Sequence, residues 1–288
     1  MRIQKTQGVE QTTLLEGDCL TLLPKLPSDS IDLICTSPPY ADCRKKTYGG
    51  IVPDDYVEWF LPISQELYRV LKPTGTFILN IKEKVVAGER STYVINLILA
   101  LRQQGWVWTE EFLWHKKNSY PGKWPNRFRD AWERLLQFNK SRKFTMYQDA
   151  VMIPPKESTI TRAQSARPHE DVRHESATGS GFGRNIIKTV GRTRVYPSNV
   201  LHLATECSNR NHSATFPESI PEWFIKLFTV ENDTVLDPFA GAGTTGVACR
   251  RLGRRFIGME IVPEYVKIAM DRINATPAPA EVPLSSSV

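Results

Sequence analysis

A chain of 288 residues can form one large domain, or one domain that carries a sizeable insertion. Its 41% hydrophobic and 24% charged residues are typical of a globular protein, and no apolar run reaches the length of a transmembrane helix. The N-terminal sequence MRIQKTQGVEQ lacks the apolar stretch of a secretory signal, so we expect a cytoplasmic protein with no membrane partner.

The positive charge of the chain is concentrated in one segment. The whole chain carries a net charge of +6, whereas residues 115–200 hold 17 Lys and Arg against 7 Asp and Glu, a balance of +10. The rest of the chain therefore carries about −4. A basic segment on a mildly acidic body predicts a surface that binds a polyanion, with a merely solvated surface as the alternative.

The cysteines show no CxxC pair and no spacing typical of metal ligands. There are five of them: Cys19, Cys35, Cys43, Cys207 and Cys249. Three lie in apolar contexts, where a buried free thiol is the simplest interpretation. We expect neither disulfides nor a bound metal.

The first third of the sequence alternates apolar runs of strand length with apolar residues at helical spacing. Strands are expected at residues 13–16, 31–35, 76–81 and 107–114, and helices at residues 19–26, 56–71 and 93–104. The helix at 56–71 is followed by Pro73 and Gly75, which are typical of a helix end. Strands that alternate with helices predict an α/β fold with a mainly parallel sheet.

This regular pattern breaks from residue 116 to about residue 210. The stretch is rich in Arg, Lys, Ser, Thr and Gly, and ATGSGFGRN at 177–185 does not suit a regular helix or strand. Aromatic residues recur among the basic ones: Tyr120, Trp124, Phe128, Trp132, Tyr147, Phe182 and Tyr196. We therefore interpret this segment as a binding insert, with a long flexible linker as the alternative.

Regular alternation returns in the last third. Helices are expected at residues 221–229, 241–252 and 263–273, and strands at residues 233–237 and 255–259. The final segment, residues 274–288, is rich in Pro, Ala and Ser, so we expect it to be disordered.

The segment TVLDPFAGAGTTG at 234–246 predicts a ligand site. A hydrophobic strand ends in Asp237, glycines permit a tight turn, and a helix begins at once. Such a turn lets a ligand approach the backbone at the carboxyl edge of a parallel sheet, as in dinucleotide or phosphate sites. No Lys follows the glycines, which excludes a P-loop. Glu260 ends the next strand and is placed to accept hydrogen bonds from ribose hydroxyls.

Two motifs carry a family resemblance. D-P-F-x-G-x-G-T-T at 237–245, together with T-S-P-P-Y at 36–40, resembles the amino-methyltransferases of DNA, and the order of the two motifs resembles the beta class. The resemblance covers most of residues 12–273. It implies methyl transfer from S-adenosylmethionine to an exocyclic amino group of a flipped base in double-stranded DNA.

The resemblance also implies a division of the chain. It predicts a Rossmann-like methyltransferase fold, with a twisted, mainly parallel sheet and helices on both faces, plus an irregular basic insert that recognises the target. The catalytic half would be residues 12–115, the recognition region residues 116–210, and the cofactor-binding half residues 211–273.

The Ser-Pro-Pro-Tyr corner is the expected catalytic site. Exocyclic amino groups are poor nucleophiles, because their lone pair is delocalised into the ring. The Ser37 hydroxyl and the Pro38 carbonyl can accept both amino hydrogens, while Pro38 and Pro39 stiffen the backbone. Tyr40 is expected to stack on the flipped base.

The remaining site residues follow from the resemblance and the charge pattern. Cofactor contacts are expected from Asp18, Thr36, Phe216, Pro217, Asp237, Pro238, Phe239, Gly241, Gly243, Thr244 and Glu260. DNA contacts are expected from Arg44, Lys45, Lys46, Lys116, Lys117, Arg184, Arg192 and Arg194. Within the insert, the favoured place for base-reading residues is the stretch 177–194.

Several alternatives stay open. In the family that this chain resembles, Ser at the first motif position is commoner among cytosine-N4 enzymes, so the resemblance favours cytosine N4 as the target, with adenine N6 as the alternative. An RNA or protein-glutamine methyltransferase and an inactive DNA-binding regulator are the other interpretations. The chain contains no Glu-x-Lys tripeptide, so we expect no nuclease activity of its own. A separate restriction endonuclease partner and a homodimer are left open.

Overall fold

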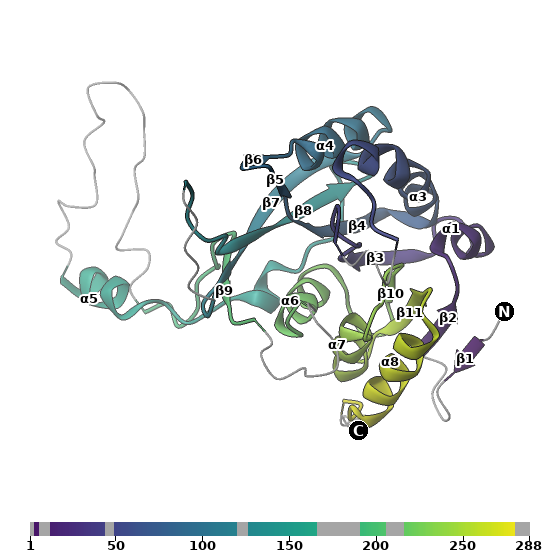
Figure 1. The fold of residues 1–288 in the computed structure, drawn as a ribbon. Helices are drawn as coiled ribbons and strands as arrows, with labels where there is room; N and C mark the ends of the chain where they lie inside the picture. The colour runs from purple at the N-terminus through teal and green to yellow at the C-terminus, as the bar shows by residue number, and fades with distance from the viewer. Residues whose placement is uncertain are drawn as a thin grey trace, which may run out of the picture. The chain divides into compact units, whose positions relative to one another are not determined.

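The structure is a computed structural model that describes residues 3–5, 12–43, 49–119, 126–165, 191–205 and 216–279. The chain divides into two compact units (Figure 1). The larger unit comprises Met1–Tyr147 and Asn199–Val288, and the smaller unit is Gln148–Ser198. Within the described residues, no helix combines the length and the apolar character that a membrane span requires.

A nine-stranded sheet forms the centre of the larger unit. Its strand order is β1-β2-β11-β10-β3-β4-β8-β7-β9. The strands are β1 (Ile3–Lys5), β2 (Thr12–Glu16), β3 (Ile31–Thr36), β4 (Leu71–Ile81), β7 (Val107–Lys116), β8 (Trp132–Asn139), β9 (Val200–Leu203), β10 (Thr234–Asp237) and β11 (Arg255–Glu260). The five strands from β2 to β4 in this order are parallel, and β8 is antiparallel to both of its neighbours. A separate hairpin pairs β5 (Val85–Val86) with β6 (Glu89–Arg90).

Helices cover both faces of this sheet (Figure 1). One group contains α1 (Cys19–Leu22), η1 (Leu23–Lys25), η2 (Pro53–Asp55), α3 (Tyr56–Val70) and α4 (Tyr93–Gln103). The other contains α6 (Ser219–Phe228), α7 (Thr244–Leu252) and α8 (Pro263–Ala275). In α3, buried residues recur at positions 56, 60, 63, 67 and 70, the spacing that places them on one helix face. That face packs into the main hydrophobic cluster together with strands β3 and β4.

The expected α/β fold with a mainly parallel sheet is confirmed, and most elements lie where the sequence predicts them. One expected helix, 19–26, is divided into α1 and the 3-10 turn η1, with Pro24 at the start of that turn. Strand β4 begins at Leu71, earlier than expected, and contains Pro73 and Gly75. Helix α8 continues to Ala275, into the tail expected to be disordered, and residues 280–288 lie outside the described residues.

The structure also differs from the expected limits of the irregular insert. Strand β8 falls within 116–210, yet it lies between β4 and β7 in the main sheet. Residues 133 and 135–139 of this strand are buried, so both of its faces are covered and no alternation of polar and apolar residues marks it in the sequence. The segment that separates from the larger unit is shorter, residues 148–198.

A short antiparallel bridge joins the beginning and the end of the smaller unit. Ile153 and Val195 exchange two backbone hydrogen bonds, of 2.9 and 2.8 Å. Tyr196 Oη donates to Asp149 Oδ1 at 2.9 Å, and Arg194 Nη2 donates to the Met152 carbonyl at 2.9 Å. The unit also contains η3 (Gln148–Val151) and α5 (Glu157–Ser165). Its two chain ends therefore lie next to each other.

Candidate active site

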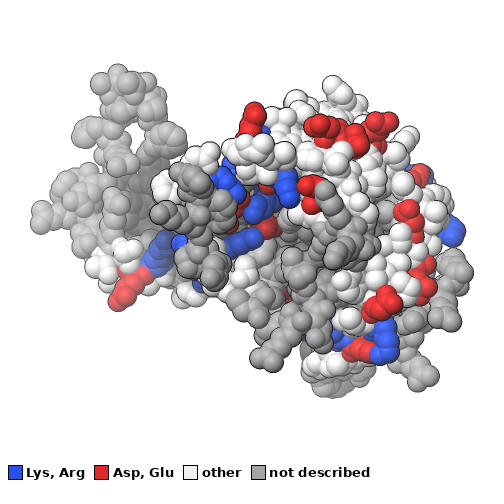
Figure 2. Space-filling model, viewed as in Figure 1, with Lys and Arg blue, Asp and Glu red and all other residues white. Residues whose placement is uncertain are grey.

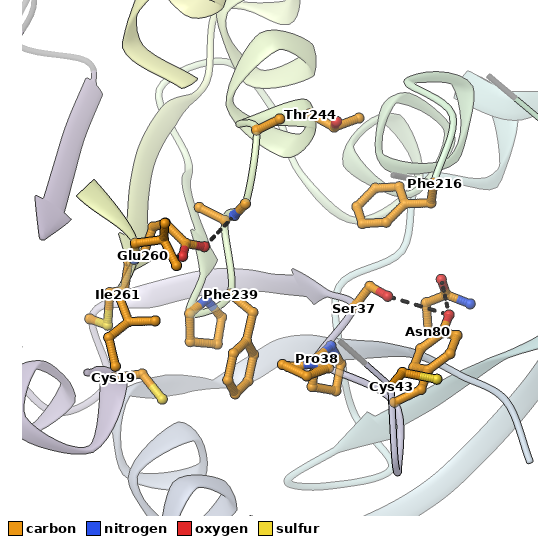
Figure 3. A pocket seen from close by; sticks show the side chains of 18 of the residues that line it. Cys19, Ser37, Pro38, Cys43, Asn80, Phe216, Phe239, Thr244, Glu260 and Ile261 are labelled. Atoms are coloured by element: carbon orange, nitrogen blue, oxygen red, sulfur yellow. Dashed lines mark hydrogen bonds between the residues drawn. The ribbon is translucent and has the colours of Figure 1, made fainter. Parts of the chain in front are cut away.

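Two loops that are far apart in the sequence meet at the carboxyl edge of the sheet. Strands β3 and β10 are hydrogen-bonded neighbours, with Leu33 opposite Val235 and Ile34 opposite Leu236. The Ser-Pro-Pro-Tyr corner follows β3, and the glycine turn follows β10. Both loops line one cavity of about 940 Å³ (Figure 3). In Figure 3, Glu260 and Ser37 lie at opposite ends of this cavity, with Phe239 and Pro38 between them.

The glycine turn needs residues without a side chain at two positions. Gly241 and Gly243 have φ angles of 51° and 78°, in the left-handed region that favours glycine. A Cβ on Gly243 would lie 2.8 Å from Cβ of Ala269, so α7 could not begin this close to α8 with a larger residue. The sequence pattern G-A-G therefore allows helix α7 to begin directly at the cavity.

Glu260 fixes the other side of the turn. Its Oε2 accepts a hydrogen bond from the Gly241 amide and its Oε1 accepts one from the Val262 amide, each at 2.9 Å. The residue is buried and lines the cavity. Each carboxylate oxygen can accept more than one hydrogen bond, so this geometry is compatible with a further donor from a ligand. The ribose contact of Glu260 stays a prediction.

Asp237 and Thr36 lie beneath the turn, not on the cavity surface. The Asp237 carboxylate accepts hydrogen bonds from Thr36 Oγ1 at 2.6 Å, Thr245 Oγ1 at 2.8 Å and the Phe239 amide at 3.1 Å. Burial raises the pKa of Asp237 to about 6, although these three hydrogen bonds lower it, and the charge of Glu260 raises it further. Both side chains were expected to contact the cofactor, but the structure gives them a supporting position under the loop.

The Ser-Pro-Pro-Tyr corner is held by hydrogen bonds from two directions. Tyr56 Oη donates to the Pro39 carbonyl at 3.0 Å, which ties the corner to α3. Ser37 Oγ donates to Tyr40 Oη at 3.4 Å, and Tyr40 Oη in turn donates to Glu133 Oε2 at 2.6 Å. Burial, followed by the charge of Glu133, raises the pKa of Tyr40 well above 10, so its hydroxyl stays protonated.

Strands β4, β7 and β8 supply cavity residues that the sequence did not predict. Asn80 from β4 lies beside Ser37 (Figure 3), and its Oδ1 is 3.0 Å from Tyr40 Oη. Glu133 from β8 forms an ion pair with Lys116 of β7, with 2.5 Å between Oε1 and Nζ. Their place depends on the pairing of β4, β8 and β7, which no local pattern in the sequence reveals. Cys19, Cys43, Trp59 and Trp114 also line the cavity.

The expected site residues fall into four groups. Those that line the cavity are Asp18, Ser37, Pro38, Pro39, Tyr40, Lys116, Phe216, Pro238, Phe239, Gly241, Thr244 and Glu260. Those placed elsewhere in the larger unit are Thr36, Lys117, Pro217, Asp237 and Gly243. Arg192 and Arg194 belong to the smaller unit, whereas Arg44, Lys45, Lys46 and Arg184 lie outside the described residues. Lys116, expected at a DNA phosphate, instead pairs with Glu133 inside the cavity.

A further group of basic side chains lies over the β5–β8 region of the larger unit (Figure 2). Asp130 pairs with Arg90 at 2.5 Å, Arg127 at 3.3 Å and Lys82 at 3.5 Å. Although burial acts in the opposite direction, the Arg90 hydrogen bond and these positive charges lower the pKa of Asp130. Asp130, on the loop that leads into β8, thus brings together three cations from different parts of the chain.

Comparison with known proteins gives a consistent result. A family described as DNA methylase, covering N6 and N4 methyltransferases, matches residues 31–271. The type II methyltransferase M.PvuII of Proteus hauseri is 31% identical over 271 residues, which cover 87% of this chain and 80% of that protein. The DNA adenine methyltransferase YhdJ of Escherichia coli K12 is 28% identical over 278 residues, covering 93% and 84%. The solved structure of the PvuII DNA methyltransferase, titled cytosine-N4-specific, has a TM-score of 0.70 and 27% identity, covering 94% of this chain and 90% of that one.

Proposed function

Since this chain belongs to the DNA methylase family of N6 and N4 methyltransferases, we propose that it methylates the N4 amino group of cytosine in double-stranded DNA at a specific site. The methyl donor of the reaction is S-adenosylmethionine, which supplies an electrophilic methyl group on a sulfonium. Adenine N6 is the second candidate, because both bases present the same two amino hydrogens to the corner. The enzyme would act in the cytoplasm.

One observation carries this proposal. The corner after β3 and the glycine turn after β10 line the same cavity, although the chain separates them by about 200 residues. A group that accepts amino hydrogens thus lies in one cavity with a turn that suits a nucleoside cofactor. Methyl transfer needs this arrangement, because nucleophile and electrophile must be held in line.

The residues around the turn fit the cofactor. Glu260 would accept the ribose hydroxyls, and Asp18, at the end of β2, would face the adenine ring. The Trp59 and Phe239 rings, whose centroids lie 5.9 Å apart, give this part of the cavity an apolar wall. A carboxylate at one end and aromatic rings beside it suit a nucleoside, which has both hydroxyl groups and a flat apolar surface.

The corner would hold the amino group of the flipped base. Ser37 donates its own proton to Tyr40, which leaves the lone pairs of Ser37 to accept an amino hydrogen. The Pro38 carbonyl would accept the other hydrogen. The two acceptors together draw the nitrogen toward a tetrahedral geometry and make its lone pair available. Stacking of the base on the Tyr40 ring belongs to the same proposal.

Two findings favour cytosine N4 over adenine N6. Ser37 occupies the first position of the corner motif, and a structural relative that covers nearly the whole chain is titled cytosine-N4-specific. The similarity to an adenine methyltransferase keeps adenine N6 as the alternative. Mass spectrometry of nucleosides from DNA treated with the protein distinguishes the two bases directly.

The test of the function is transfer of a labelled methyl group from S-adenosylmethionine to DNA. The wild-type protein should label double-stranded DNA, and Ser37→Ala should label it at least tenfold more slowly while binding the cofactor equally well, because Ser37 faces the base. Equal labelling of RNA or protein would favour those substrates. Cofactor binding without any transfer would instead indicate an inactive regulator.

Partners other than DNA are part of the same proposal. A restriction endonuclease with the same recognition sequence would be blocked by DNA that this protein has methylated, which a cleavage assay measures. Sedimentation of the protein with and without DNA distinguishes a homodimer from a monomer.

A further inference from the structure

A buried carboxylate is connected to the catalytic serine by a chain of hydrogen bonds. Ser37 Oγ donates to Tyr40 Oη at 3.4 Å, and Tyr40 Oη donates to Glu133 Oε2 at 2.6 Å. Every donor in this chain points in the same direction, from the cavity toward Glu133. The second contact is short, as expected for a hydrogen bond to a charged acceptor.

The surroundings of Glu133 hold it in one position. Only 6% of the residue is exposed. Lys116 Nζ lies 2.5 Å from Oε1, and Asn80 Nδ2 donates to Oε2 at 3.2 Å. The Lys116 ion pair compensates the cost of burying the carboxylate and leaves Oε2 directed at Tyr40.

Glu133 is the carboxylate that is connected to the corner. Among the described residues that line the cavity, three carry a carboxylate: Asp18, Glu133 and Glu260. Asp18 caps α1 through the Leu20 amide, and Glu260 accepts from the Gly241 and Val262 amides at the other end of the cavity. Asn80 lies beside Ser37, but an amide does not accept a proton at neutral pH.

Methyl transfer at the corner requires the amino nitrogen to lose one proton. The amino nitrogen forms its new bond to the methyl carbon with its own lone pair, and the electrons of the broken carbon–sulfur bond stay on the sulfur of the donor. The nitrogen then carries a positive charge until one of its N–H bonds breaks. A nearby base that takes this proton prevents the charge from accumulating in the cavity.

We propose that Glu133 is the final acceptor of this proton, which reaches it through Ser37 and Tyr40. The amino N–H proton moves to Ser37 Oγ, the Ser37 proton moves to Tyr40 Oη, and the Tyr40 proton moves to Glu133 Oε2. The methylated base becomes neutral, both hydroxyls are restored, and Glu133 becomes a neutral carboxylic acid beside Lys116. Glu133 does not contact the base in this scheme; it acts through Tyr40. The inference rests on the proposed function.

The test compares Glu133→Gln with the wild-type protein in single-turnover methyl transfer across a range of pH. The wild-type rate should fall on the acid side, because a carboxylate that is already protonated cannot accept the proton of the amino group. Glu133→Gln should be slower by about a hundredfold at neutral pH, within the range typical of acid–base catalysis. It should also lack the acid limb, which is the fall of the rate on the acid side. Binding of S-adenosylmethionine and of DNA, measured separately, should stay the same.

Other groups near Glu133 do not produce this acid limb. Lys116 faces it from β7, Tyr40 from the corner, and Tyr93 from α4. A lysine ammonium keeps its charge at acid pH, and burial raises the pKa of both tyrosines. Asp237, whose pKa is raised to about 6, also takes up a proton on the acid side, but its contribution would remain in Glu133→Gln.

A second variant interrupts the chain without leaving Lys116 unpaired. Tyr40→Phe keeps the ring and should reproduce both the rate loss and the missing limb. The double variant should be no slower than either single one, because residues that act in series are not additive. Glu133→Asp should recover part of the rate. Glu110→Gln, an exposed change on β7, serves as the matched control and should behave like the wild type.

The outcomes distinguish a failure of the proton relay through Ser37, Tyr40 and Glu133 from a failure of the proposed function. If Glu133→Gln and Tyr40→Phe keep the wild-type rate, or lose rate but keep the acid limb of the wild type, the relay is wrong. A wild-type protein that binds S-adenosylmethionine but methylates no DNA overturns the proposed function instead.

Discussion

At the scale of single residues, Asp237 supports the glycine turn, and its contribution to the free energy of unfolding depends on pH. The carboxylate is fully enclosed beneath the glycine turn, and three donors satisfy it. Burial nevertheless raises its pKa from 3.8 to about 6, which means that the folded protein binds this proton more tightly than the unfolded chain does. The stability that Asp237 contributes is therefore complete below the unfolded pKa and is lost as the pH rises through about 6.

Asp237→Asn should remove this dependence. The rise from 3.8 to about 6 corresponds to about 3 kcal/mol. The free energy of unfolding of the wild-type protein should therefore fall, between pH 4 and 7, by about that amount relative to the variant. Urea unfolding at several pH values measures the difference. Asp271→Asn, at an exposed position on α8, is the control and should follow the wild type; equal slopes for all three proteins would contradict the prediction.

Glu260 offers a second test at this scale. Hydrogen bonds from ribose hydroxyls to a carboxylate contribute about 1.5–3 kcal/mol, so Glu260→Gln should weaken S-adenosylmethionine binding about tenfold or more. Calorimetry of cofactor binding measures this. Glu264→Gln, an exposed residue in the first turn of α8, should bind as the wild type does. Unchanged affinity in the Glu260 variant would rule out the ribose contact.

At the scale of elements, the junction of β10 and α7 depends on close approach. Gly243 has a left-handed φ of 78°, and an added Cβ would meet both Cβ and Cα of Ala269, at 2.8 and 3.0 Å. Gly191 has a nearly equal φ of 77°, but no atom of the described residues lies within 4 Å of such a Cβ. Alanine substitutions at the two glycines therefore distinguish the free-energy cost of the left-handed backbone conformation from the cost of the close contact with Ala269.

Gly243→Ala should accordingly be more destabilising than Gly191→Ala. The left-handed conformation costs about 1–2 kcal/mol in both variants, and the clash with α8 adds about 1–3 kcal/mol in the first. Denaturant unfolding measures the two losses. Equal losses would mean that α8 moves away from the turn without cost.

Elements also show how far the sequence could predict this protein. The helical spacing in α3 and the glycines before α7 are local patterns, so they could be read directly from the chain. Glu133 could not, because its strand has no polar–apolar alternation. Its position beside Tyr40 depends on the pairing of β8 with β7 and with the more distant strand β4. Thr36 and Asp237 are expected from the sequence to contact the cofactor, but only the fold shows that they bond to each other beneath the turn.

At the scale of the whole molecule, the smaller unit is the part of the basic insert that can be removed cleanly. Residues 148–198 form their own compact unit, and the Ile153–Val195 bridge brings its two ends together. A short glycine linker can therefore replace residues 157–191 without stretching the larger unit. Because the cavity belongs to the larger unit, its residues are all retained.

This excision should separate recognition from cofactor binding. S-adenosylmethionine binding should be unchanged, whereas methylation of the specific site should be lost. The salt dependence of DNA binding should become shallower by about one unit for each phosphate contact removed. Calorimetry and DNA-binding assays at several salt concentrations measure the two effects. If the shortened protein still methylates the same site at a similar rate, recognition lies in the larger unit.

The strand order of the sheet has a consequence for synthesis of the protein on the ribosome. Strands β11 and β10 fill the space between β2 and β3, although they are made last. At about 5–20 residues per second, the roughly 200 residues between β3 and β10 delay that pairing by about 10–40 seconds. During this time one edge of β3, including Leu33 and Ile34, has no partner and is prone to pair with other chains. The nascent N-terminal half is therefore expected to need a chaperone until the C-terminal strands emerge and close the sheet.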